Sequence, residues 1–444
     1  MITLVEPQKH IAELWGKQKV IEQATYRLMH YVFRVDYDKK VHLHNFVTGE
    51  QVILEQEETE LVDKLPALYR PEMEQMVTNH YLVPEDSDEH QQVSNLRQII
   101  RKLADVQRPK NITHYTILTT TACNARCYYC FEQGIKTVTM SEQTANDVVD
   151  YIATNCSKNE KVHISWFGGE PTVVTYRIDQ ICSGLQEKRV DFWSDITTNA
   201  YLFDADMVYR ARKLWNLQSA NISMDGIGER YNNIKAYVNP TENPYQRVLR
   251  NAGLLLQEGI RVNIRMNFDV NNYSDFEGLL HDIQERYGDS PLLNVYAHQI
   301  NGEYSNDGIH GSEEWFAEKI VELNSLAREH GLYRKSLHPW ALISIGCKAA
   351  MDSTVTITPE GNLVRCPEQL GEDQITGTVK EGVTNEELVQ SWKQLVDFAM
   401  CEDCCYYPIC LKVLNCTAKE RCIYKREYDA LYREETIKIY NASL

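Results

Sequence analysis

The sequence predicts an α/β protein whose largest domain is built on a parallel sheet, either open or closed into a partial barrel. Strand-like apolar runs alternate with helix-like segments six times between residues 112 and 330, the order that gives parallel strands covered by helices. A β-rich segment followed by helices precedes this region, and eight of the 13 cysteines follow it, within residues 347–422. A chain of 444 residues exceeds one ordinary core, so we expect two or three domains.

The N-terminal part predicts a small domain of its own. Residues 1–25 indicate little beyond a short helix, whereas the residues that follow are β-rich, with a tight turn at 48–50. The strands are expected at 26–34, 40–47 and 51–55. The apolar residues of a later helical pattern share one face: Met73, Met76, Val77 and Tyr81. A small sheet followed by helices is a winged-helix-like order. The acidic segment 84–92 is typical of a linker, which places this domain and its linker at 1–105.

The central region, residues 106–330, predicts six strand–helix units. The strands are expected at 112–119, 162–167, 192–197, 220–224, 262–268 and 292–299. The helices are expected at 141–155, 175–187, 204–214, 245–258, 276–287 and 313–330. Ser141 and Asp204 are suited to cap the N-termini of two helices, and Gly259 is suited to end a third. Active sites of such folds collect at the carboxyl ends of the strands, where the candidate motifs should therefore lie.

Composition and charge exclude some classes of function. The net charge of −17 repels a phosphate backbone, so binding of nucleic acid is not expected. The first residues lack the pattern of a secretory signal, and no apolar run reaches the ~18 residues of a membrane helix. We therefore expect a cytoplasmic protein with no membrane partner. In that reducing compartment, cysteines at this density favour metal binding over disulfides.

The first chemical motif is Cys123-x3-Cys127-x2-Cys130, in the loop after the first strand of the central region. Three thiolates at this spacing can bind one face of a [4Fe–4S] cluster and leave one iron open to a cofactor or substrate. A structural zinc site is the alternative, but zinc usually takes four ligands in paired spacings, and no fourth ligand is close in the sequence. The motif therefore favours a catalytic cluster.

This motif after the first strand of a (β/α)6 region resembles the signature of the radical S-adenosylmethionine (SAM) superfamily. Over about residues 110–330 the resemblance implies a partial (β/α)6 TIM barrel, one cluster bound by Cys123, Cys127 and Cys130, and SAM as cofactor. It also implies an electron donor such as flavodoxin or ferredoxin, and hydrogen abstraction by a 5′-deoxyadenosyl radical. Polar motifs at later strand ends match the SAM-binding positions of relatives: Tyr129, Gly168, Gly169, Glu170, Thr198, Asn199, Ser223, Asp225, Arg265 and Asn267.

The later cysteines resemble the SPASM extension of radical SAM proteins, with Gly361 five positions before Cys366. This resemblance implies a SPASM domain at 331–444 with two auxiliary [4Fe–4S] clusters, and hence three clusters in all. The first auxiliary cluster, with one open iron, would be held by Cys347, Cys366 and Cys416. The second would be held by Cys401, Cys404, Cys410 and Cys422.

The spacing departs from the family at one point. The gap between Cys410 and Cys416 is x5 where relatives have x3, and the gap that follows is short. Exchange of ligands among Cys416, Cys422 and the additional Cys405 therefore stays open, as does the fourth ligand of the first auxiliary cluster. A zinc ribbon is the alternative for Cys401, Cys404 and Cys410. The two remaining cysteines of the chain, Cys156 and Cys182 in the central region, are expected to be core thiols on helices.

The N-terminal domain resembles, in its architecture, the peptide-recognition (RRE, PqqD-like) domain fused to many SPASM maturases. That resemblance implies a ribosomally made precursor peptide whose leader adds as a strand to the small sheet. We therefore expect a maturase that installs an oxidative cross-link, either a thioether or a C–C or C–O bond. A structural cap on the barrel is the simpler alternative for this domain, and its acidity disfavours a winged helix that reads DNA.

Three other functions stay open. A sulfatase-maturase-like enzyme forming formylglycine is disfavoured because Pro367 stands where relatives have an acidic base, with Glu368 one position later. An iron–sulfur electron carrier would explain the clusters but not the SAM motifs, and a peptide-binding adaptor would need no cluster. Beyond the cluster ligands, no catalytic residue is assigned. His298 and Glu303 are weak candidates for the lining of the substrate cavity, and Glu132 is a weak candidate for positioning SAM or sealing the cysteine loop.

Overall fold

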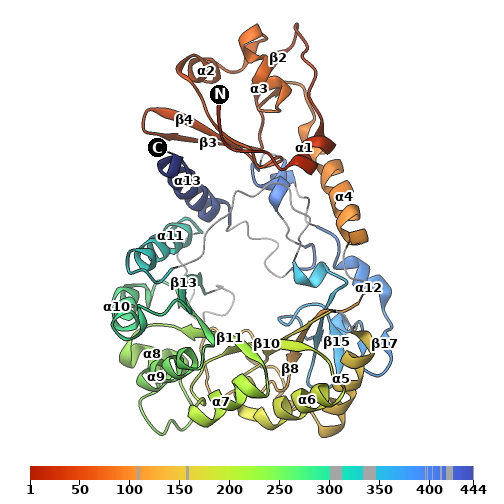
Figure 1. Ribbon diagram of the computed structural model, residues 1–444, viewed down its shortest axis with the longest axis vertical. Helices are drawn as coiled ribbons and strands as arrows, with labels where there is room; N and C mark the ends of the chain where they lie inside the picture. Colours follow the sequence, from red (N-terminus) through yellow and green to blue (C-terminus); the bar gives the residue numbers. More distant parts are fainter. Residues whose placement is uncertain are drawn as a thin grey trace. The chain divides into compact units, whose positions relative to one another are not determined.

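The computed structural model describes ten stretches of the chain, which fall into two compact units (Figure 1). The described residues are 1–107, 111–156, 160–300, 313–333, 347–395, 397, 399–402, 404–410, 413–416 and 424–443. One unit comprises Met1–Arg108, Ser336–Cys347 and Leu395–Leu444, and the other comprises Pro109–Lys335 and Lys348–Gln394. We call them the N-terminal unit and the barrel unit. The segment 331–444 thus contributes residues to both units.

The barrel unit contains the six predicted parallel strands, and they lie side by side in chain order. They are β8 (His114–Leu118), β9 (Val162–Phe167), β10 (Phe192–Thr198), β11 (Leu217–Met224), β12 (Arg261–Phe268) and β13 (Leu293–Gln299). The predicted helices are α5 (Glu142–Asn155), α6 (Thr175–Glu187), α7 (Ala205–Lys213), α9 (Pro244–Gln257), α10 (Phe276–Tyr287) and α11 (Glu313–Glu329). Figure 1 shows α5–α10 along the outer side of the curved sheet. The partial (β/α)6 barrel is confirmed.

Local signals set the helix ends as expected. The side chain of Ser141 accepts a hydrogen bond from the Thr144 amide, and that of Asp204 accepts one from the Met207 amide. Gly259 follows α9 with a φ of +74°, a conformation that favours glycine. Two helices of the described barrel unit were not predicted: α8 (Gly228–Lys235), between β11 and α9, and the short α12 (Glu386–Ser391).

The strands alternate strictly between two environments. On β9 and β10, the residues facing the helices are buried, for example Ile164 and Ile196, and they join the apolar core. The residues between them are half-buried and mostly polar, such as His163 and Asp195. Because side chains of a strand point alternately to its two faces, the inner face of the barrel is polar. The candidate site is built at the carboxyl end of this polar face.

Four strands that the sequence did not predict extend this sheet beyond β8. β14 (Thr354–Ile357) pairs parallel to β8, and β15 (Asn362–Val364), β16 (Gly377–Thr378) and β17 (Gly382–Val383) follow in antiparallel order. β14 is buried along its whole length, which explains why it belongs to the barrel unit. A four-residue strand of alternating threonine and aliphatic residues carries too weak a pattern to be recognised in the sequence.

The N-terminal unit contains a four-stranded antiparallel sheet in the order β1-β5-β4-β3. Its strands are β1 (Ile2–Val5), β3 (Val32–Tyr37), β4 (Lys40–Asn45) and β5 (Gln51–Ile53). A second sheet has the order β6-β2-β7, with β2 (Thr25–Leu28), β6 (Ala67–Leu68) and β7 (Leu82–Pro84). The helices are α1 (Lys9–Trp15), α2 (Gln56–Val62), α3 (Glu74–Thr78) and α4 (Glu89–Gln107). The expected order of a small sheet followed by helices is therefore present.

Three local predictions for this unit were wrong. Residues 1–25 contain a strand, β1, besides the short helix. The expected strand at 26–34 is two strands, β2 and β3, which belong to different sheets. The expected linker 84–92 runs into α4, because the buried carboxylate of Glu89 pairs with Arg27 and accepts from the backbone amide of His30 at 3.2 Å. The Glu89 side chain is therefore buried against its own unit and does not face solvent as a linker residue would.

The C-terminal helix α13 (Tyr424–Ser443) packs on the four-stranded sheet of its own unit. The ring of Tyr432 contacts those of His44 and Phe46, and the ring of Tyr440 meets that of His42 at 5.0 Å. None of the described helices combines the length and apolar character that a membrane span requires.

Candidate active site

The loop after β8 carries the three cysteines of the first motif, all of them half-buried. Backbone contacts fix the loop: the Arg126 amide donates to the Lys235 carbonyl at 2.9 Å, and the Ala125 amide points to Cys123 Sγ at 3.4 Å. Burial raises the pKa of Cys123 to about 12 and that of Cys127 to about 11. Bare thiols here would stay protonated at neutral pH, so a metal group must displace their protons to be bound.

The donor set favours a cluster over a single ion. A tetrahedral zinc ion with Zn–S bonds of about 2.3 Å would hold its sulfurs about 3.8 Å apart. The sulfurs of Cys123, Cys127 and Cys130 do not all lie within 4.8 Å of one another, so the loop is not preset for one ion. Three half-buried thiols of one loop are the donor set of a [4Fe–4S] cube with one open iron.

The two glycines after β9 bring two loops of the site together. A Cβ on Gly168, whose φ is +121°, would lie 2.2 Å from the Thr120 carbonyl oxygen, and one on Gly169 would lie 2.5 Å from the Ala122 carbonyl oxygen. The Gly169 amide donates to Thr120 O at 3.1 Å. These glycines therefore admit the backbone that leads into Cys123, whereas the sequence suggested close approach to a ligand.

Glu170 ties the ends of β9 and β10 together. Its buried carboxylate accepts from the Thr172 amide at 3.0 Å, from Thr198 Oγ1 at 2.8 Å and from the Asn199 amide at 2.7 Å. Burial raises its pKa, and these donors oppose the shift. The Asn199 side chain continues to the cysteine loop, donating to Asn124 Oδ1 at 2.7 Å. Glu170 thus orders the strand ends, and its predicted contact with the SAM amino group stays a prediction.

A second group of polar residues surrounds Asp225, at the end of β11. Tyr129 donates its hydroxyl to Asp225 Oδ2 at 2.6 Å, and the Asn267 amide donates to Oδ1 at 2.9 Å. Lys235 Nζ lies 2.8 Å from Oδ2 and donates to Ser223 Oγ at 2.7 Å. The structure therefore brings together four of the predicted residues from the cysteine loop, β11 and β12.

Lys235 is the member of this group that the sequence reasoning missed. Its side chain is 2% exposed, and it ends the unpredicted helix α8. Burial alone would lower the pKa of this ammonium, but the adjacent Asp225 carboxylate and the surrounding phenols hold it well above its usual range. The site therefore contains a permanent buried cation.

Arg265 lies outside this hydrogen-bonded group. It stands opposite Ser223 on β11 and opposite Tyr296 on β13, two positions before Asn267 on the same face of β12. Burial, and then the charge of Arg265, lowers the pKa of His298 to about 4, so this imidazole is neutral at physiological pH. His298 thus belongs to the polar inner face, and its place in a substrate cavity stays a prediction. Burial raises the pKa of Glu132 to about 7, and Glu303 lies outside the described residues.

The later cysteines are distributed over both units. Cys366 follows β15 in the barrel unit, whereas Cys347, Cys401, Cys404, Cys405, Cys410 and Cys416 belong to the N-terminal unit. Cys422 lies outside the described residues. No disulfide joins any of the described cysteines. Cys182 is a buried thiol of α6, as expected, and half-buried Cys156 ends α5. The two auxiliary ligand sets stay predictions.

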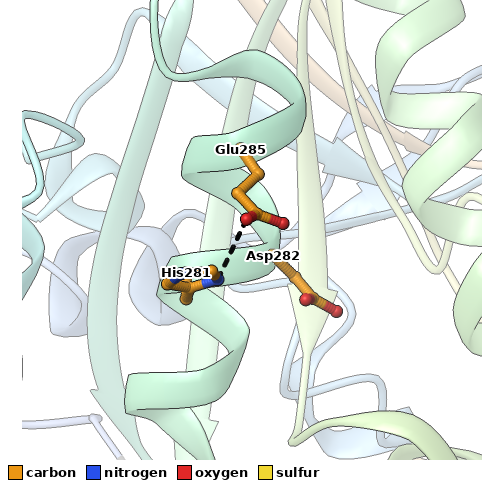
Figure 2. A group of neighbouring side chains, drawn as sticks. All are labelled: His281, Asp282 and Glu285. Carbon is orange, nitrogen blue, oxygen red and sulfur yellow. Dashed lines mark ion pairs between the residues drawn. The ribbon is translucent and has the colours of Figure 1, made fainter.

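One surface group has the geometry of a single-ion site but not its setting. Within the described stretches, only His281, Asp282 and Glu285 of α10 bring three ligand atoms within 4.8 Å of one another. His281 Nδ1 pairs with Glu285 Oε1 at 3.8 Å, and both side chains are exposed. Figure 2 shows Asp282 directed away from this pair, and its carboxylate accepts from the Tyr245 hydroxyl at 2.8 Å. We assign the group to surface ion pairing and to the α9–α10 contact.

Comparison with known proteins agrees with this geometry. Residues 117–283 match the Radical SAM superfamily. The structure of anSMEcpe with bound AdoMet superposes with a TM-score of 0.57 at 14% identity, over 74% of this chain and 99% of that one. The structure of Streptococcus suis SuiB bound to its precursor peptide SuiA superposes with a TM-score of 0.54 at 13% identity, over 91% and 98%. No curated protein sequence matches the chain.

The barrel, the cysteine loop and the polar strand ends are those of a radical SAM domain. Residues 117–283 form that domain, and the chain is an enzyme.

Proposed function

We propose that this enzyme is a SPASM-type maturase that installs an oxidative cross-link in a ribosomally made precursor peptide. The observation that carries the proposal is the fold shared with SuiB over 91% of this chain, because that structure contains a precursor peptide. A second structure in the comparison, anSMEcpe with bound AdoMet and Cp18Cys peptide, superposes over 74% of this chain with a TM-score of 0.55. The likeness to SuiB extends well beyond the barrel, into the N-terminal unit.

The cofactor site is proposed around Cys123, Cys127 and Cys130, whose donor set and spacing fit a [4Fe–4S] cluster. When bound, the cluster and SAM supply a 5′-deoxyadenosyl radical that removes a hydrogen atom from the substrate. Lys235, a buried cation beside Ser223, would bind the SAM carboxylate. Asp225 can accept hydrogen bonds from ribose hydroxyls or from the SAM ammonium group while Tyr129 and Asn267 hold it in place.

The peptide is proposed to bind through the N-terminal unit. The two outer strands of its four-stranded sheet are β1 and β3, and an extended leader can add to an exposed sheet edge through backbone hydrogen bonds. The reactive part of the peptide would enter the polar inner face at the carboxyl end of the barrel, where Arg265 and His298 lie. The two auxiliary clusters would accept electrons released as the new bond forms.

Anaerobic reconstitution tests the proposal. We expect about 12 irons per chain for three [4Fe–4S] clusters, and formation of 5′-deoxyadenosine from SAM after reduction, abolished in Cys127→Ala. A candidate precursor peptide that binds the N-terminal unit should then lose two hydrogens without losing sulfur. An iron-loaded protein that cleaves no SAM, with or without that peptide, would instead support the electron-carrier alternative. Cleavage of SAM with an unmodified peptide would remove the maturase proposal but keep the enzyme class.

A further inference from the structure

The loop Cys401–Cys410 is built into the core of the N-terminal unit. Tyr407, in the middle of this loop, is 2% exposed and belongs to the same apolar cluster as Tyr31 and Val93. Cys401 and Cys404 pack against that cluster. The rings of Tyr31 and Tyr407 stack with centroids 6.0 Å apart and an interplanar angle of 30°. A change in the cysteine loop therefore acts directly on the core under the N-terminal sheet.

Helix α4 holds this loop through one face. Arg97 is 9% exposed, donates from Nη2 to the Cys410 carbonyl oxygen at 2.5 Å, and stacks its guanidinium 4.1 Å from the centre of the Tyr407 ring. Two helical turns earlier, His90 Nε2 lies 3.0 Å from Asp397 Oδ1, and the Tyr407 hydroxyl donates to the other oxygen of Asp397 at 3.2 Å. The carbonyl of Cys410 and the ring of Tyr407 thus share a single buried cation.

The loop itself is suited to ligate metal. The Cys404 amide donates to Cys401 O at 3.2 Å, the Tyr407 amide to Cys404 O at 2.9 Å, and the Cys410 amide to Tyr406 O at 2.8 Å. These short turns gather four thiols, those of Cys401, Cys404, Cys405 and Cys410, into one compact loop, and none of them forms a disulfide. Three thiolates with C-x2-C-x5-C spacing fit an iron–sulfur cluster, whose reduction potential depends on nearby charges and hydrogen bonds.

We propose that Arg97 is a positioning residue for a cluster held by Cys401, Cys404 and Cys410, and that it joins the redox state of this cluster to the peptide-recognition unit. The inference rests on the proposed function, because it takes these cysteines as ligands. Reduction adds negative charge to the cluster, and the fixed guanidinium stabilises that charge. Ligation in turn fixes Tyr407 against Tyr31, next to the first residue of β3, so loss of the cluster loosens the sheet.

The first test isolates this cluster in the full chain. A background with Ala at Cys123, Cys127, Cys130 and Cys366 is reconstituted and titrated potentiometrically with electron paramagnetic resonance detection. Arg97→Gln should lower the equilibrium constant for one-electron reduction about tenfold, which corresponds to about 59 mV. Arg97→Lys should recover part of the lost reduction potential. The positive charge returns, but not the planar guanidinium that donates to the Cys410 carbonyl and stacks on Tyr407. Lys102→Gln, which removes the same charge from an exposed position of α4, should leave the potential unchanged.

An unchanged potential in Arg97→Gln, or an equal shift in Lys102→Gln, overturns the proposal. A background that retains no iron overturns it as well, while SAM cleavage by the wild-type protein tests the proposed function separately. If Arg97→Gln fails to fold, hydrogen exchange of the four-alanine background, with Arg97 intact, tests the linkage between the cluster and the sheet. Backbone amides of β3 and α4 should exchange more slowly in the iron-loaded chain than in the iron-free chain, and equal exchange contradicts the linkage.

Discussion

Lys235 lies 2.8 Å from Asp225 with both side chains almost fully buried, at 2% and 0% exposure. The pair joins the end of β11 to the cysteine loop, because Tyr129 donates to Asp225 and the Lys235 carbonyl accepts from the Arg126 amide. A buried ion pair adds little net stability when it is intact, since desolvation offsets attraction, but losing one partner leaves an uncompensated charge.

Lys235→Met should therefore destabilise the protein by about 3–5 kcal/mol and abolish tight SAM binding. Asp225→Asn should be destabilising as well, and the double variant should lose less than the sum of the two single losses, by about 0.5–3 kcal/mol. Urea unfolding of the four proteins measures this coupling, and equilibrium dialysis measures SAM. Additive losses in the double variant would show that the two residues do not act as a pair.

Gly168→Ala and Gly169→Ala should separate the two loops of the site. The new Cβ would lie 2.2 Å or 2.5 Å from a backbone oxygen, so the chain leading to Cys123 must move. We expect several-fold less iron retained per chain after reconstitution. Gly134→Ala is the matched control, because it also has a positive φ, +81°, but no atom within 4 Å of its Cβ.

The control should incur only the backbone cost of about 1–2 kcal/mol. If Gly134→Ala loses as much iron as Gly168→Ala, the close approach of the two backbones is not the cause.

Stability should fall in acid partly through His114, on the inner face of β8. Burial, with the adjacent His163 and Lys348, lowers the pKa of His114 to about 3, against about 6.5 when unfolded. Between these two pKa values, His114 is protonated in the unfolded chain and neutral in the folded chain. The free energy of unfolding therefore falls as the pH decreases from about 6.5 towards 3, by up to about 1.4 kcal/mol per pH unit. His114→Gln should flatten this slope in urea unfolding measured between pH 6.5 and 4. An unchanged slope would show that His114 is protonated in the folded state.

The Asp282 carboxylate should matter for packing and not for metal. Asp282→Asn and Tyr245→Phe should each cost about 1 kcal/mol of unfolding free energy, and the double variant should cost little more than either one. His281→Ala and Glu285→Ala, which remove the exposed partners, should change neither stability nor iron content appreciably. Stabilisation by added zinc that disappears in His281→Ala would contradict this assignment.

The barrel could be predicted from the sequence because its strands carry continuous or alternating apolar patterns between clear helix signals. Ser141 and Asp204 marked helix starts by local chemistry alone, and the structure confirms both. The strand-end motifs were also recognisable, since Tyr129, Ser223, Asp225 and Asn267 come together as a group.

Lys235 could not be predicted in the same way. It lies ten positions after Asp225, on a short polar helix without an apolar stripe, and only the burial of that helix end reveals its role. The place of Cys401–Cys410 was equally hidden, because its attachment to the N-terminal unit depends on Tyr407 and Arg97, residues more than 300 positions apart. Contacts of that separation leave no periodic signal in either segment.

The shared core of Tyr31 and Tyr407 has a consequence for biosynthesis. The ribosome completes residue 31 long before residue 407, and at about 5–20 residues per second the earlier segment waits on the order of 20–75 s for its partner. The barrel unit, all of whose residues lie between these two in the chain, can fold meanwhile. The N-terminal unit therefore reaches its final packing after the barrel has been made, and a nascent chain interrupted before Tyr407 leaves an apolar surface exposed to chaperones.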